Sequence, residues 1–155
     1  MKGLQNLSGI IDKTVIHAKD REFDVAHLLN DKLGSDQFDF KRQVQIACDY
    51  AKGTVAKIAG VEAPKFEDTE KTAEELKARI DKTIAFLMTI KPEQLNGREE
   101  EKIEIYYFPG KYLPAFEYLI DLAIPNFYFH MTTAYSILRK NGLKLGKGDN
   151  VGNVA

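Results

Sequence analysis

Apolar residues near the N-terminus recur every three or four positions, which is the spacing of one face of an α-helix. The same period returns after Asp39, whose carboxylate is placed to cap free helix amides, and stops at Gly60. A third such stretch begins at Thr72, which stands at capping-box spacing from Glu75, and ends before Pro92. The pattern therefore predicts three long amphipathic helices.

A fourth helix is predicted over residues 116–140, because apolar positions again follow the helical period and Gly142 provides a C-terminal stop. Pro125 lies inside this helix and has no amide hydrogen. The carbonyl of Asp121 then loses its helical partner, so we expect a kink at this position.

Shorter elements are predicted between and after the long helices. Residues 102–108 alternate polar and apolar side chains and lead into a turn at Pro109–Gly110, which is the pattern of a short β-hairpin. A short helix is predicted at residues 25–32, and the tail after Gly142 is expected to be a loosely packed strap. Together these elements predict an all-α, four-helix bundle with a short β-hairpin before the last helix, in a single domain of residues 1–155.

Composition adds limits on partners and location. The 155 residues are 44% hydrophobic and 29% charged, which is ordinary for one globular domain. A net charge of −1, from 22 basic and 23 acidic residues, gives no electrostatic reason to expect a nucleic acid or a membrane as a partner. The sequence shows no signal-peptide core or membrane-spanning stretch, and the single Cys48 excludes an intrachain disulfide. We therefore expect a soluble cytoplasmic protein.

His130 is the most informative polar residue of the predicted last helix. It shares the apolar stripe with Phe127 and Ala134, so its imidazole is expected to point into the bundle, and Asn126 lies one turn away on the same side. A histidine in that place must find hydrogen-bond partners or change its protonation state. The interpretation as a core histidine is favoured over a ligand or catalytic role, because one inward histidine is weak evidence beside a metal-spaced pair.

Gln45 and Asp49 lie beside the apolar stripe of the second predicted helix. If that helix faces the last one, both side chains could meet Asn126 and His130, and Asp49 could orient the imidazole as carboxylates do for metal-bound histidines. The alternative, with equal weight, is that both lie on a solvated flank. Cys48 lies on the stripe itself, and a buried small hydrophobe is favoured there over a nucleophile, because a helix interior offers no amides that lower a thiol pKa.

A group of aromatic residues surrounds the predicted hairpin. Packing of the hairpin on the end of the bundle is the favoured interpretation, and lining of a ligand pocket is the alternative. The residues are Tyr106, Tyr107, Phe108, Tyr112, Phe116 and Tyr118.

Three segments of the sequence closely resemble a family of uncharacterised bacterial proteins. They are residues 124–142, which contain the specific run Pro-Asn-Phe-Tyr-Phe-His, residues 42–49 and residues 60–69. The family is a domain of unknown function that is placed in the DinB/YfiT-like superfamily of four-helix bundles, many of which are regarded as metalloenzymes. The resemblance covers nearly the whole chain and implies the same fold.

The superfamily includes thiol-dependent S-transferases and a maleylpyruvate isomerase, whose metal is held by three histidines. One is on the second helix and two are spaced four residues apart on the last. The resemblance places His130 at the second of that pair, Asn126 at the first, and Gln45 at the position on the second helix. Since a neutral amide oxygen is a weak ligand for zinc or nickel, the resemblance implies a degenerate metal position, with His130 as its remaining histidine.

Three hypotheses about function follow. The favoured one is a protein that binds a small molecule without metal-dependent activity, in a pocket formed by Gln45, Asp49, Asn126 and His130, within a homodimer. The second is a metal- or thiol-dependent S-transferase or isomerase-like enzyme, with His130 as ligand or base and Asp49 orienting it. The third is a structural or protein-interaction module.

Overall fold

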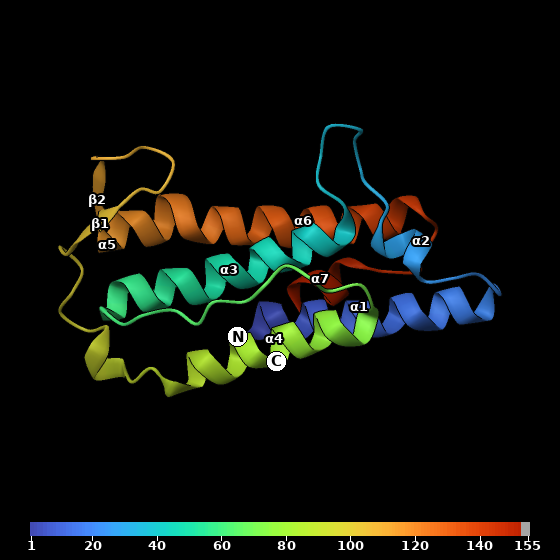
Figure 1. Ribbon diagram of the computed structural model, residues 1–155, viewed down its shortest axis with the longest axis horizontal. Helices are drawn as coiled ribbons and strands as arrows, with labels where there is room; N and C mark the ends of the chain where they lie inside the picture. The colour runs from blue at the N-terminus through green and yellow to red at the C-terminus, as the bar shows by residue number, and fades with distance from the viewer. Residues whose placement is uncertain (153–155) are drawn as a thin grey trace.

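A computed structural model describes residues 1–152 of the protein, and residues 153–155 of the predicted domain lie outside them (Figure 1). Four long helices run side by side along the longest axis of the molecule. This arrangement confirms the predicted helical bundle. The helices are α1 (Lys2–Asp20), α3 (Phe40–Ala59), α4 (Ala73–Thr89) and α6 (Ile124–Lys140).

The predicted ends of α3 and α4 are confirmed by their hydrogen bonds. The Asp39 carboxylate accepts from the Arg42 amide at the start of α3, and Gly60 ends the helix in the left-handed conformation with φ of 68°. At α4, the Thr72 hydroxyl accepts from the Glu75 amide while the Glu75 carboxylate accepts from the Thr72 amide. Each bond satisfies a backbone amide that the helix leaves without a partner.

The predicted hairpin before the last long helix is also present. Strands β1 (Lys102–Glu104) and β2 (Tyr112–Pro114) pair antiparallel, with Ile103 opposite Leu113. The short helix expected near residue 25 is α2 (Ala26–Leu29), and a 3₁₀ turn at Pro92–Gln94 follows α4.

The tail after the last long helix is more ordered than expected. It contains the short helix α7 (Lys147–Val151), which packs on α1, and the side chains of Leu143 and Leu145 are buried. The Asn6 side chain also donates to the Asn150 carbonyl at 3.1 Å. The expectation of a loosely packed strap is therefore wrong for this segment, because the two leucines reach the core.

The segment before α6 differs from the continuous helix that the sequence predicts. A short turn of α-helix, α5 (Ala115–Glu117), leads into the π-helical segment η2 (Tyr118–Ala123), in which the Ile124 amide reaches back five residues to the Leu119 carbonyl. Pro125 lies in the first turn of α6, directly after this segment. A π-helical turn, a feature that often occurs at functional sites, thus directly precedes the proline at which the kink was expected.

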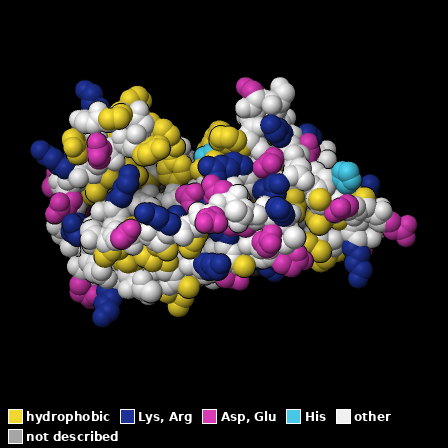
Figure 2. Space-filling view, viewed as in Figure 1, with side chains coloured by type: hydrophobic (Ala, Val, Ile, Leu, Met, Phe, Trp, Pro, Cys, Tyr) yellow, Lys and Arg dark blue, Asp and Glu magenta, His cyan; other side chains and the backbone are white. Residues whose placement is uncertain are grey.

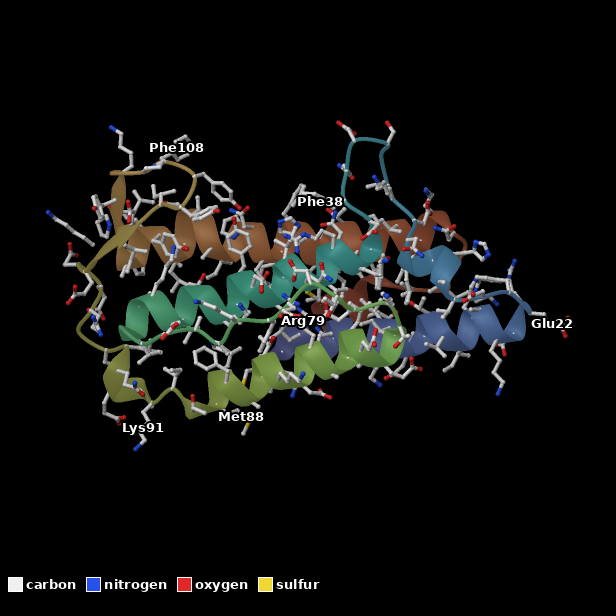
Figure 3. All side chains as sticks on the ribbon, viewed as in Figure 1. Glu22, Phe38, Arg79, Met88, Lys91 and Phe108 are labelled. Atoms are coloured by element: carbon white, nitrogen blue, oxygen red, sulfur yellow. The ribbon has the colours of Figure 1, made fainter. Side chains whose placement is uncertain are left out.

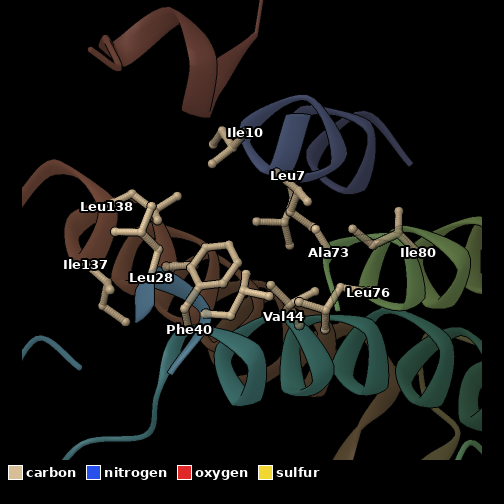
Figure 4. Close-up of a cluster of buried hydrophobic side chains, with 14 of the residues drawn as sticks. Leu7, Ile10, Leu28, Phe40, Val44, Ala73, Leu76, Ile80, Ile137 and Leu138 are labelled. Atoms are coloured by element: carbon tan, nitrogen blue, oxygen red, sulfur yellow. The ribbon is translucent and has the colours of Figure 1, made fainter. Parts of the chain in front are cut away.

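The core lies between the long helices and is apolar (Figure 4). Leu7 of α1, Val44 of α3, Leu76 of α4 and Ile137 of α6 are each fully buried there. Within residues 1–152, none of the helices combines the length and apolarity that a membrane span requires.

Candidate ligand-binding cleft

A cleft of about 610 Å³ follows the line where α3 packs against η2 and α6. Arg42, Asp49, Lys57, Asn126 and His130 supply its charged and polar side chains. Its aromatic walls are formed by Phe38, Tyr50, Tyr106, Tyr107 and Tyr118.

A second hollow of about 300 Å³ lies on the other side of Tyr50 and Thr54, which line both. Its walls are mainly apolar, with Leu4 and Phe127 among them, and include neither a histidine nor a carboxylate. The larger cleft is therefore the candidate site, because it brings titratable side chains together with aromatic walls.

His130 is held in the cleft through one nitrogen of its ring. Nδ1 lies 2.7 Å from Oε1 of Gln43, a buried residue of α3. The Gln43 amide nitrogen donates to the Phe38 carbonyl at 3.1 Å, so the amide is oriented with Oε1 as the acceptor. Nδ1 of His130 therefore carries the proton and donates, and Nε2 is an unprotonated acceptor. Gln43 does not line the cleft whereas His130 does, so the ring is anchored from behind and presents its opposite edge to the cleft.

The plane and charge state of the His130 ring are also determined by its neighbours. Tyr50 stacks on the imidazole with ring centres 5.9 Å apart, and Phe129 contacts it edge-on at 5.2 Å. Burial and the positive charge of Arg42 both hold the pKa of His130 below its usual value of 6.5. The imidazole is consequently neutral at physiological pH.

The structure separates Gln45 from the other residues predicted for the site. Its amide nitrogen donates to the Glu70 carboxylate at 2.9 Å, and its oxygen accepts from Arg42 at 3.2 Å. Gln45 does not line the cleft, and the expected meeting with His130 is made by Gln43 instead. Gln43 could have been found from its spacing, because it stands three residues after the buried Phe40 on the inward face of α3.

Asp49 lines the same cleft as His130 but does not orient the imidazole as expected. Its Oδ1 atom pairs with Arg79 Nη2 at 2.9 Å and with Lys52 Nζ at 3.0 Å. The carboxylate is thus engaged by two cations, and Gln43 takes the orienting role.

Asn126 also lines the cleft, one turn before His130. Its side-chain nitrogen donates to the Leu122 carbonyl at 2.7 Å, in the turn where η2 passes into α6. The amide therefore satisfies a backbone carbonyl near Pro125.

Comparison with known proteins identifies the family and the fold of the chain. Residues 1–151 match the family described as "Domain of unknown function (DUF1993)". The chain belongs to this family. A crystal structure described as a DinB family member protein from Shewanella denitrificans is 43% identical, superposes with a TM-score of 0.94, and is matched over 99% of this chain and 87% of that chain. No curated protein matches the chain. The resemblance and the fold expected from the sequence are thereby confirmed.

The metal position that the sequence resemblance implies does not fit the side chains of this DUF1993 member. Gln43 Oε1 is already occupied by His130 Nδ1, the Asn126 amide is bonded to Leu122, and Gln45 faces Glu70. Within residues 1–152, His, Cys, Asp and Glu side chains form no group of three that could hold a metal ion. Strong donors for zinc or nickel at this place would be Nε2 of His130 and the Asp49 carboxylate, which is paired with Arg79 and Lys52, and such ions need three or four.

Cys48 lies in the core and is fully buried. Burial raises the pKa of its thiol to about 11, so the thiolate needed for nucleophilic attack is scarce at neutral pH. The favoured interpretation of Cys48 as a small buried hydrophobe is the one that the structure supports.

The aromatic residues around the hairpin divide between the two interpretations that the sequence left open. The side chains of Tyr106 and Tyr107 are 81% and 63% exposed, and both line the cleft. Figure 2 shows hydrophobic side chains on both sides of a hollow at the upper edge of the molecule. In Figure 3, Phe38 and Phe108 project on this same upper side, from two loops that are distant in sequence. Tyr118, in contrast, is buried in a cluster that joins the hairpin to α3, as the favoured interpretation expected.

Proposed function

We propose that the protein binds a small organic molecule with a planar ring in the cleft, without a metal ion, and that His130 accepts a hydrogen bond from it. The observation that carries the proposal is the bond between His130 Nδ1 and Gln43 Oε1. It fixes one tautomer of a neutral imidazole and leaves Nε2 as an acceptor. Within residues 1–152, Nε2 has no hydrogen-bond partner, so a ligand can supply one.

The walls of the cleft support a ring-shaped ligand. A volume of about 610 Å³ is in the range of ligand pockets, which are usually aromatic or apolar with a few placed polar groups. Phe38, Tyr106 and Tyr107 are each more than half exposed at its mouth. Exposed apolar side chains that gather beside polar ones mark an interaction site, and a bound ring would cover these.

The surroundings of His130 favour binding over acid–base catalysis. A catalytic histidine is commonly paired with a carboxylate that stabilises its protonated form. Here the partner of Nδ1 is a neutral amide, and the carboxylate of Asp49 is committed to Arg79 and Lys52. The lowered pKa of His130 suits an acceptor that stays unprotonated.

The test is an NMR titration of the chelator-treated protein with ring-bearing fragments, following the ring protons of His130. We expect fragments with a hydroxyl or N–H donor to shift these signals and to bind equally well after zinc or nickel is added. His130→Phe should weaken their binding about tenfold, the loss of roughly one hydrogen bond. His27→Phe, in the exposed part of α2, is the matched control and should not alter binding. Binding that requires added metal, or no binding of any fragment, would contradict the proposal.

A further inference from the structure

The guanidinium of Arg42 is engaged on one side only. Nη1 donates to Gln45 Oε1 at 3.2 Å and forms an ion pair with the Asp68 carboxylate. Neither of these partners lines the cleft, whereas Arg42 does. Among the residues that the structure describes, Nε and Nη2 have no acceptor. The Nε–Nη2 edge, which carries two parallel N–H groups, is therefore available on the cleft side.

The side chains of Arg42 and His130 are thus held in the same way. Each is anchored through one nitrogen by a residue outside the cleft, Arg42 by Gln45 and Asp68, and His130 by Gln43. Each then presents its other edge to the cleft, a pair of donors from Arg42 and one acceptor from His130. Both side chains line the same cleft, and the charge of Arg42 acts on the imidazole.

We infer that the ligand is an aromatic carboxylate that also carries a hydroxyl group, with the carboxylate on the Arg42 fork and the hydroxyl donating to His130 Nε2. The inference rests on the proposed function and names the ligand class of the same cleft. A planar guanidinium edge matches the two oxygens of a carboxylate, and an imidazole acceptor requires a donor. The aromatic ring between the two groups lies against Tyr50, which stacks on His130, and Phe38, whose ring centre is 5.9 Å from Arg42 Cζ.

The other charges of the cleft are compatible with an anionic ligand. Asp49 is the carboxylate among the lining residues, and its charge is offset by Arg79 and Lys52. Lys57 is a second cation, but it lies fifteen positions after Arg42 on α3, about 22 Å along the helix axis. It donates to the Glu104 carbonyl at that far end. Lys57 is consequently a matched control for the effect of a positive charge in the same cleft.

Calorimetric titration of the full chain with three related compounds tests the inference. Meta-hydroxybenzoate has both groups and cannot bond its own hydroxyl to its carboxylate. Meta-hydroxybenzamide lacks the charge, and meta-methoxybenzoate lacks the donor. We expect meta-hydroxybenzoate to bind at least about tenfold more tightly than either, because each comparison removes one hydrogen bond, one of them to a charged group. This comparison does not depend on the folding of any variant.

Variants then assign each preference to its residue. Arg42→Gln should abolish the preference for the acid over the amide and keep the preference for hydroxyl over methoxy, and His130→Phe should do the reverse. Lys57→Gln should change neither. If the acid binds no more tightly than the amide, or if Lys57→Gln removes its advantage, the inference is overturned. In that case binding of the amide with shifts of the His130 ring signals leaves the proposed function standing. If none of the three compounds and no neutral ring binds, both are overturned.

Discussion

Two polar clusters lie on the flanks of α3, and they differ in how completely their members are engaged. Arg79 is 2% exposed, and both terminal nitrogens of its guanidinium pair with Asp49, Asp68 and Glu70 at 2.9 to 3.0 Å, while its buried Nε has no hydrogen-bond partner among the described residues. The imidazole of His130 has one hydrogen bond, to Gln43, and its second nitrogen faces the cleft. A buried charge surrounded by its counter-charges serves the fold, whereas a half-satisfied group at a cavity is prepared to meet a ligand.

The Arg79 cluster fastens the segment between α3 and α4 to the bundle. Asp68 and Glu70 belong to this segment, and the Phe66 ring lies 5.5 Å from Arg79 Cζ. Figure 3 shows Arg79 beneath this segment, between α3 and α4. The cluster also acts on the cleft indirectly, because Asp68 is the ion-pair partner of Arg42.

Replacement of Arg79 is expected to have the largest effect. Arg79→Met leaves three carboxylates without their shared cation and should lower the free energy of unfolding by roughly 3 kcal/mol, the lower end for a broken buried ion pair, because Asp49 and Asp68 are partly exposed. Urea unfolding followed by circular dichroism measures it. Lys82→Met, an exposed cation on the same helix, should change stability by less than about 0.5 kcal/mol. Equal urea midpoints for the two variants would show that the Arg79 cluster does not stabilise the fold.

Replacement of Gln43 is expected to have a smaller effect on stability and a specific one on the cleft. Gln43→Leu removes the bonds to His130 and to the Phe38 carbonyl, at a cost of about 1–2 kcal/mol. It should also release the tautomer of His130, which the nitrogen chemical shifts of the imidazole report.

Gln45→Leu provides the matched control for this experiment. Gln45 is buried like Gln43 but bonds Glu70 and Arg42, so the substitution should cost similar stability and leave the His130 tautomer unchanged. An equal response of the imidazole to both variants would contradict the assignment of Gln43 as its anchor.

The contrast between these two glutamines shows what the sequence could and could not predict. Helix ends at Asp39, Gly60 and Thr72 depend on neighbouring residues and were predicted correctly, as was the apolar period that forms the bundle. Gln43 and Gln45 differ by two positions, which is roughly 200° around the helix axis. The spacing from Phe40 places Gln43 on the inward face of α3, but the side chain that it meets is decided by the rotation of α3 against α6, which no local pattern contains.

Two other features depend on similar non-local facts. Arg79 pairs with carboxylates from α3 and from the segment before α4, which are distant from it in sequence. Its burial could still have been predicted, because it lies beside Leu76 and Ile80 on the inward stripe of α4. The proline at position 125 was recognised as a disturbance, but the π-helical turn before it was not predicted, because its form depends on the packing around it.

Protonation of His130 is expected to have the smallest effect on stability. Its pH dependence tests whether the imidazole in the cleft is neutral. Burial and Arg42 favour the neutral imidazole, so the pKa of His130 in the folded protein should lie below 6.5 in an NMR titration of its ring protons. The unfolded chain then binds the proton more readily, and stability should fall as pH drops from 6.5 through the folded pKa.

Arg42→Gln removes one of the two causes of the lowered pKa, so the pKa of His130 should rise toward 6.5. Asp49, the carboxylate that lines the cleft, remains paired with Arg79 and Lys52 in this variant. Lys57→Gln, at the far end of the cleft, should leave the pKa unchanged. A His130 pKa above about 7 in the wild-type protein would mean that a negative charge acts on the ring and outweighs the effects of burial and Arg42. Nε2 of His130 would then carry a proton and donate at neutral pH. The contrast between the ion-paired Arg79 cluster and an acceptor site at His130 would be lost.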